Sequence, residues 1–164
     1  MLLGTGEVRR ILIVDLDVHQ GDGSAACFQH DPRVTTLSVH AASNFPLRKV
    51  QGDLDVPLAD ATSDDDYLAA IADRLPDALD TIAPDLVLYN AGVDPHRDDR
   101  LGRLALSDAG LNMRDRLVLD ACLRRRIPTA TVIGGGYDAL APLVQRHAIV
   151  VRAAAEQARL FDLP

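Results

Sequence analysis

The chain has 164 residues, enough for one domain that buries about 70% of the surface exposed by its unfolded chain. Twenty-four acidic against seventeen basic residues give a net charge of −7, which excludes nucleic acid as an expected direct partner. The N-terminal segment lacks the apolar core of a signal peptide, and the apolar runs are too short to span a membrane. The sequence therefore predicts a cytoplasmic protein without membrane contact, with residues 1–164 in a single domain.

Short apolar runs alternate with amphipathic stretches along the first part of the chain. Residues 11–14 predict a buried strand and residues 24–30 a short helix. Residues 34–40 are rich in β-branched side chains and predict a second strand. The stretch 41–61 has little periodicity, so we expect an irregular excursion with one short strand around 54–56.

The second part of the chain continues this alternation. A long helix is expected from Ser63, whose hydroxyl can cap it, to Pro84, with a kink at Pro76. Further strands are predicted at 86–89 and 129–133, a helix at 107–126, and helical structure in two pieces at 139–161. Strands that alternate with helices indicate an α/β fold in which helices flank a parallel β-sheet.

Three of the predicted strands run into loops of unusual composition. The strand at 11–14 is followed by DLDVHQGDG at 15–23, the strand at 86–89 by NAGVD at 90–94, and the strand at 129–133 by GGGY at 134–137. In a parallel sheet the carboxyl ends of the strands meet at one edge, where ligands commonly bind. We therefore expect these three loops to converge.

Two carboxylates and an imidazole in the first loop, with one carboxylate from the second, suggest a metal site. Asp15, Asp17 and His19 would project to one side if the extended conformation persists beyond the strand. Asp17, His19 and Asp94 would give three ligands and leave an open position, as in catalytic zinc sites. As an alternative, Asp15 and Asp17 could only cap the turn that follows.

Four motifs in this order resemble the histone deacetylase family of the arginase/deacetylase fold. They are DLDVHQGDG, LSVH followed by NFP, NAGVD followed by DRLG, and GGGY, and their wording is closest to the class IV type and its bacterial relatives. The resemblance covers essentially the whole chain. It implies an α/β, arginase/deacetylase-like fold whose N-terminal part is absent, so that 1–164 would be a truncated domain, the C-terminal half. It also implies a hydrolase that removes acetyl or other acyl groups from lysine or a similar amine.

The resemblance assigns roles to particular residues. The metal ligands would be Asp17, His19 and Asp94, and Tyr137 would hydrogen-bond the carbonyl under attack. Zinc is the expected metal, although such a ligand set accepts iron(II) as well. A structural potassium ion would bind Asp15, the Ser38 hydroxyl and the main chain of Asp17, His19 and Val39; the substrate channel would be lined by Phe45, Gly135 and Gly136.

The chain departs from the family pattern in its histidines. A complete member carries a tandem histidine pair in its first half as general base and acid, whereas no two of the five histidines here are adjacent. Asp15 and Asp22 match the carboxylates that orient this pair. The resemblance therefore predicts impaired catalysis by this chain alone, together with self-association or pairing with the missing N-terminal half. The four histidines other than His19 are expected to be ordinary surface or loop residues.

Several alternatives stay open from sequence. The chain could be a non-catalytic remnant that binds a metal or a partner. A phosphotransferase of the haloacid dehalogenase type would fit the run from Asp15 to Val18, but it needs a downstream lysine and only Lys49 is present. The acyl substrate could be an acetylated lysine peptide, a small acetylated amine such as a polyamine, or a longer fatty acyl group.

Overall fold

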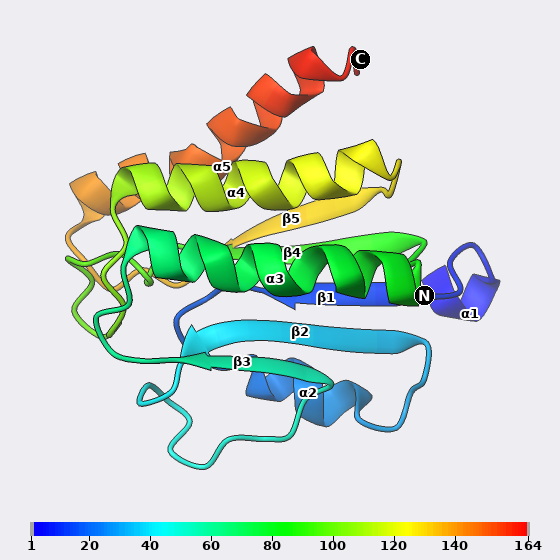
Figure 1. Cartoon of the computed structure of the whole chain (residues 1–164), viewed down its shortest axis with the longest axis horizontal. Helices are drawn as coiled ribbons and strands as arrows, with labels where there is room; N and C mark the ends of the chain where they lie inside the picture. The colour runs from blue at the N-terminus through cyan, green and yellow to red at the C-terminus, as the bar shows by residue number, and fades with distance from the viewer. Residues whose placement is uncertain (1, 164) are drawn as a thin grey trace.

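A five-stranded sheet forms the centre of the protein, as seen in a computed structural model that describes residues 2–163. The strand order is β3-β2-β1-β4-β5 and all neighbouring strands are parallel (Figure 1). The strands are β1 (Ile11–Asp15), β2 (Val34–Ala41), β3 (Leu54–Leu58), β4 (Leu86–Gly92) and β5 (Thr129–Gly134). This arrangement confirms the parallel α/β fold expected from the alternating pattern.

Helices cover much of this sheet. They are α1 (Leu2–Thr5), which the sequence pattern did not predict, α2 (Asp22–Phe28), α3 (Asp64–Ile82), α4 (Asp108–Arg124) and α5 (Leu140–Leu160). Helices α3 and α4 lie side by side on the near face of the sheet in Figure 1, and α2 lies behind it. Within residues 2–163, no helix combines the length and apolar character that crossing a membrane requires.

The boundaries of the helices follow local sequence signals. The Ser63 hydroxyl accepts a hydrogen bond from the Asp66 amide at the start of α3, and the helix ends at Ala83 in a left-handed conformation before Pro84. Helix α5 is continuous, so the prediction of two pieces was wrong. Its proline, Pro142, lies in the first turn, where a missing amide hydrogen leaves no intrahelical bond unmade.

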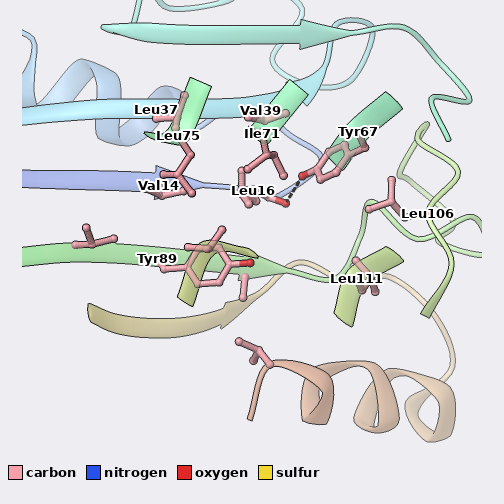
Figure 2. Packing of buried hydrophobic residues seen from close by; sticks show 14 of the residues in the cluster. Val14, Leu16, Leu37, Val39, Tyr67, Ile71, Leu75, Tyr89, Leu106 and Leu111 are labelled. Carbon is pink, nitrogen blue, oxygen red and sulfur yellow. Dashed lines mark hydrogen bonds between the residues drawn. The ribbon is translucent and has the colours of Figure 1, made fainter. Parts of the chain in front are cut away.

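The hydrophobic core lies between one face of the sheet and helices α3 and α4. Leu16 follows β1 on the side shared by Val14 and meets Tyr67 and Ile71 of α3 (Figure 2). Five side chains of this core, from the sheet and the two helices, are completely buried: Leu12, Val14, Val87, Ile71 and Val118. Because paired residues of parallel strands point to the same side, the register fixes which side chains of β1, β2 and β4 share this core.

The second face of the sheet is covered only in part. Helix α2 lies over β2, while a trough over β1, β4 and β5 is lined by Ile13, Leu88 and Val132. On the edge strand β5, Val132 and Ile133 are 58% and 59% exposed although they point to opposite faces. Apolar side chains are thus open to water on both sides of β5, next to an unpaired strand edge.

Two histidines that we expected at the surface or in ordinary loops are buried instead. His40 lies on β2, where its Nδ1 is 3.0 Å from the Ser38 hydroxyl. His96 follows β4, and its Nδ1 accepts a hydrogen bond from the Asp98 amide. The expectation was wrong for this pair because each imidazole finds polar partners inside the fold, which offsets the cost of removing it from water.

Candidate metal centre

Asp17, His19 and Asp94 converge at the carboxyl edge of the sheet. Each offers a ligand atom, and the three atoms lie within 4.8 Å of one another. His19 Nδ1 is 2.9 Å from a carboxylate oxygen of Asp17 and 3.1 Å from one of Asp94. His19 and Asp94 are 75 positions apart in the sequence. The expected convergence of the three residues is therefore confirmed.

The ends of β1 and β4 position these side chains. Strand β1 ends at Asp15, so the extended conformation that the sequence suggested does not continue to His19. The side chains of Asp15 and Asp17 therefore have different neighbours. The Val18 amide donates to Asp94 Oδ1 at 2.9 Å, which ties the first loop to the second. Asp94 has a fully buried side chain, whereas those of Asp17 and His19 are 15% and 20% exposed, so the cluster opens to solvent on one side.

Glycines allow other segments to pack closely around the two carboxylates. A Cβ on Gly92 would lie 2.7 Å from the Asp17 Cα, closer than real Cβ atoms approach. Gly135 has a φ of +58°, and a Cβ there would collide with the Asp94 carboxylate. The glycine-rich turn after β5 is therefore required by close approach to Asp94 as well as by backbone conformation.

The charges of the three residues depend on one another. Hydrogen bonds from His19 to Asp17 and Asp94 raise the pKa of the His19 imidazole to about 10. Burial raises the pKa of the Asp94 carboxyl, while the bond to His19 opposes this shift. The carboxylates of Asp17 and Asp94 thus stabilise a positive charge placed between them.

Tyr137 lies beside this cluster. Its ring centroid is 5.9 Å from that of His19 in an edge-to-face arrangement, and the residue is 45% exposed. The Tyr137 amide donates to Asp99 Oδ2 at 2.7 Å, so the loop after β4 holds the turn after β5. Burial is the main cause that raises the pKa of the phenol, which therefore stays protonated and can donate a hydrogen bond.

Three of the residues suggested for a potassium ion, Asp15, Ser38 and Val39, lie on the neighbouring strands β1 and β2. Asp15 is paired with Ser38 across β1 and β2, and its carboxylate accepts from the Asp17 amide and the Asn90 side chain. Burial raises the pKa of Asp15 to about 6. The Ser38 hydroxyl accepts from the Gly21 amide, and Val39 is completely buried beside it.

The remaining predicted site residues lie on three other segments of the chain. Phe45 is 67% exposed, and its carbonyl accepts from the Gln20 amide next to His19. Asp22 lies in the first turn of α2, and Gly136 follows Gly135 with a φ of +93°. Lys49, which a phosphotransferase would need, donates instead to the carbonyls of Asn44 and Pro46.

Sequence reasoning missed three residues that hold the site. The sequence predicts no role for Asp99 in the DRLG motif or for Asn90 at the start of the NAGVD loop. Arg114 is completely buried in α4 and donates to the carbonyl of Leu16, directly before Asp17, and to that of Gly92, two residues before Asp94. The sequence did contain a signal for Arg114. This residue lies three residues after Leu111 and four before Val118, which places an arginine on the apolar face of its helix.

Comparison with known proteins shows the family of this chain. The histone deacetylase domain family matches residues 1–154, which is most of the chain. An uncharacterized protein of Picosynechococcus is 53% identical over 150 residues, covering 91% of this chain and 50% of the relative. Histone deacetylase 2 of Arabidopsis thaliana is 33% identical over 133 residues, covering 79% and 34%. The chain therefore spans half or less of the length of these relatives.

Solved structures give the same fold. The acetylpolyamine aminohydrolase from Burkholderia pseudomallei superposes with a TM-score of 0.74 at 22% identity, covering 93% of this chain and 45% of that one. The fold is therefore that of the arginase/deacetylase proteins, of which this chain contains one part. With the family match, it follows that the chain belongs to the histone deacetylase family.

Proposed function

We propose that this chain carries the metal centre of a deacetylase that hydrolyses an acetyl or other acyl amide of a lysine peptide or a small amine. The observation that carries the proposal is the convergence of Asp17, His19 and Asp94 within 4.8 Å, with Tyr137 beside them. Substrates of both kinds are consistent with the relatives, which include a histone deacetylase and an acetylpolyamine aminohydrolase. Family membership leaves the phosphotransferase alternative without support.

The donor set fits a divalent cation. Ligand atoms about 2 Å from zinc in a tetrahedron lie about 3.3 Å apart, and the two distances from His19 Nδ1 to carboxylate oxygens are 2.9 and 3.1 Å. Two carboxylates and one imidazole suit zinc and also iron(II). The group around Asp15 and Ser38, on β1 and β2, is the proposed place for a structural potassium ion.

Each residue has a distinct task in this chemistry. A divalent ion, when bound, supplies Lewis-acid polarisation of the amide carbonyl and lowers the pKa of an attacking water. Asp17 and Asp94 contribute negative charge, and the Val18 amide keeps the Asp94 carboxylate oriented. The protonated Tyr137 phenol donates to the oxygen on which negative charge develops, while Phe45, Gly135 and Gly136 shape the channel for the acyl chain.

Metal titration of the 164-residue chain tests the first half of the proposal. We expect one Zn²⁺, or one Fe²⁺ without oxygen, to bind per chain, and Asp94→Asn to abolish this stoichiometric binding. Asp65→Asn is the matched control, because Asp65 is an exposed acid in the first turn of α3. A wild-type chain that binds neither ion, or an Asp94→Asn chain that binds as well as wild type, would refute the metal centre.

We further propose that the trough over β1, β4 and β5 receives polypeptide that carries the adjacent histidine pair. The trough is lined by apolar side chains of Ile13, Leu88 and Val132 and by Asp15 near the metal cluster. A covering segment with apolar side chains and histidines would remove these apolar side chains from water and supply the general base and acid, a contribution of about 10²–10⁴-fold to the rate.

Complementation tests this pairing. The chain alone should self-associate and should turn over an acetyl-lysine peptide at least about 10²-fold more slowly than when mixed with the first half of a longer relative.

In the complemented form, Tyr137→Phe should lower kcat about 10²–10³-fold with unchanged metal content. Val132→Glu should prevent complementation but leave zinc binding intact. A monomeric chain that deacetylates at the complemented rate without any added half would exclude the pairing.

A second candidate is a metal-binding protein without catalytic activity. The specific observation in its favour is that Asp15 and Asp22, which match histidine-orienting carboxylates, have no adjacent histidine pair to orient within the 164 residues. Zinc binding with no deacetylation after complementation would favour this second function.

A further inference from the structure

Arg114 of α4 is a buried cation with an unusual set of partners. Its side chain has no exposed surface, and an arginine keeps its charge inside a protein. Its Nε donates to Asp115 Oδ1 at 2.9 Å and its Nη2 lies 2.8 Å from the same oxygen. The Tyr89 hydroxyl donates to that oxygen as well, at 2.5 Å. Asp115 and Tyr89 therefore hold one edge of the guanidinium in place.

The other edge of the guanidinium reaches the main chain beside the metal ligands. Arg114 Nη1 donates to the carbonyl of Leu16 at 3.2 Å and to the carbonyl of Gly92 at 2.6 Å. Leu16 directly precedes Asp17, and Gly92 lies two residues before Asp94. One nitrogen thus bridges the two segments that carry the carboxylate ligands.

This bridge lies where the sheet itself stops joining the two segments. The last pair in register between β1 and β4 is Asp15 with Asn90, and the Leu16 amide makes one further bond to the Asn90 carbonyl. The Leu16 carbonyl instead accepts from Arg114 and from the Tyr67 hydroxyl of α3, the latter drawn as a dashed line in Figure 2.

We infer that Arg114 is a positioning residue that sets the separation of Asp17 and Asp94 through the carbonyls of Leu16 and Gly92. This inference rests on the proposed function, because the separation matters only if the two carboxylates share an ion. Arginine suits the task since its planar fork presents donors to Asp115 and to both carbonyls at once, whereas a lysine ammonium is a point charge. Polar groups that orient metal ligands from outside typically change metal affinity 10- to 100-fold when replaced.

Arg114→Lys tests the inference in the full chain, with Arg116→Lys as the matched control on the exposed side of the same helix, where Arg116 faces Glu156. We expect Arg114→Lys to weaken Zn²⁺ binding about 10- to 100-fold and Arg116→Lys to leave it unchanged. The second readout needs no metal: exchange of the Val18 amide, which donates to Asp94, should accelerate at least tenfold in Arg114→Lys, while amides of the β2–β3 ladder keep their protection.

The outcomes separate the two proposals. Wild-type protein that binds no zinc refutes the metal centre, and Val18 exchange still decides the role of Arg114. Unchanged zinc affinity and unchanged Val18 exchange in Arg114→Lys overturn the inference, as does equal acceleration of all amides, which indicates a general loss of stability. If Arg114→Lys does not fold, Tyr67→Phe removes the other donor to the Leu16 carbonyl and should weaken zinc binding about two- to tenfold. No change in that variant also overturns the inference.

Discussion

Replacing Tyr89 by phenylalanine tests the buried network around Arg114, next to the candidate metal site. The change removes one hydroxyl and keeps the ring, so it opens almost no cavity. That hydroxyl donates at 2.5 Å to Asp115, which is paired with Arg114 inside the core. Burial raises the pKa of Tyr89 well above its usual range, so the hydroxyl is protonated at neutral pH and can donate.

The expected loss follows from the charge on the acceptor. A hydrogen bond to a charged group contributes about 1.5–3 kcal/mol to the free energy of unfolding. Arg114 still contacts the carboxylate in the variant, which favours the lower end of this range. For a chain of this size the loss corresponds to a decrease in Tm of roughly 3–12 °C.

Tyr67→Phe is the matched control. Its hydroxyl is equally buried but donates at 3.3 Å to the neutral carbonyl of Leu16, a bond that contributes about 0.5–1.5 kcal/mol. Urea unfolding and calorimetry of both variants should therefore rank Tyr89→Phe as the more destabilised. Equal losses, or a larger loss for Tyr67→Phe, would show that the charge on Asp115 does not govern the strength of this network.

Two further predictions concern the glycine turn and the effect of pH. Gly135→Ala should weaken zinc binding at least about tenfold, because its Cβ would collide with the Asp94 carboxylate; Gly23→Ala, which has no atom within 4 Å of the added Cβ, should bind zinc as wild type does in the same titration. Burial lowers the pKa of His40, so below about pH 6.5 the unfolded chain binds more protons than the folded protein and stability falls as the pH falls. His40→Asn should therefore lose less stability than wild type between about pH 7.5 and 5.5 in urea unfolding, and an identical loss would contradict this sign.

Much of the fold could be predicted from sequence because its signals are local. Ser63 caps α3 as expected, and the short strand expected near 54–56 is β3. Strand β4 extends three residues beyond the predicted end, to Gly92, because Gly92 is paired with Gly134 of β5. That pairing joins residues far apart in the chain, so no local pattern contains it.

The chemical identity of the candidate site was also present in the sequence. Asp17, His19, Asp94 and Tyr137 each follow an apolar run, and parallel strands bring such positions to one edge. Their roles as metal ligands and hydrogen-bond donor stay predictions that titration and complementation will test.

Only the tertiary structure decided which groups meet and which remain open. Asp15 and Asp17 are two residues apart, yet Asp15 bonds Asn90 within the sheet while Asp17 bonds His19 beyond the strand end. Besides its neighbour Asp115, the buried Arg114 bonds Leu16 and Gly92 from two other segments of the chain. The exposure of Val132 and Ile133 on β5 is likewise visible only in the folded structure. Sequence periodicity specifies the face on which a side chain lies, but the contacts across that face come from packing between distant segments, and these set the geometry of the site.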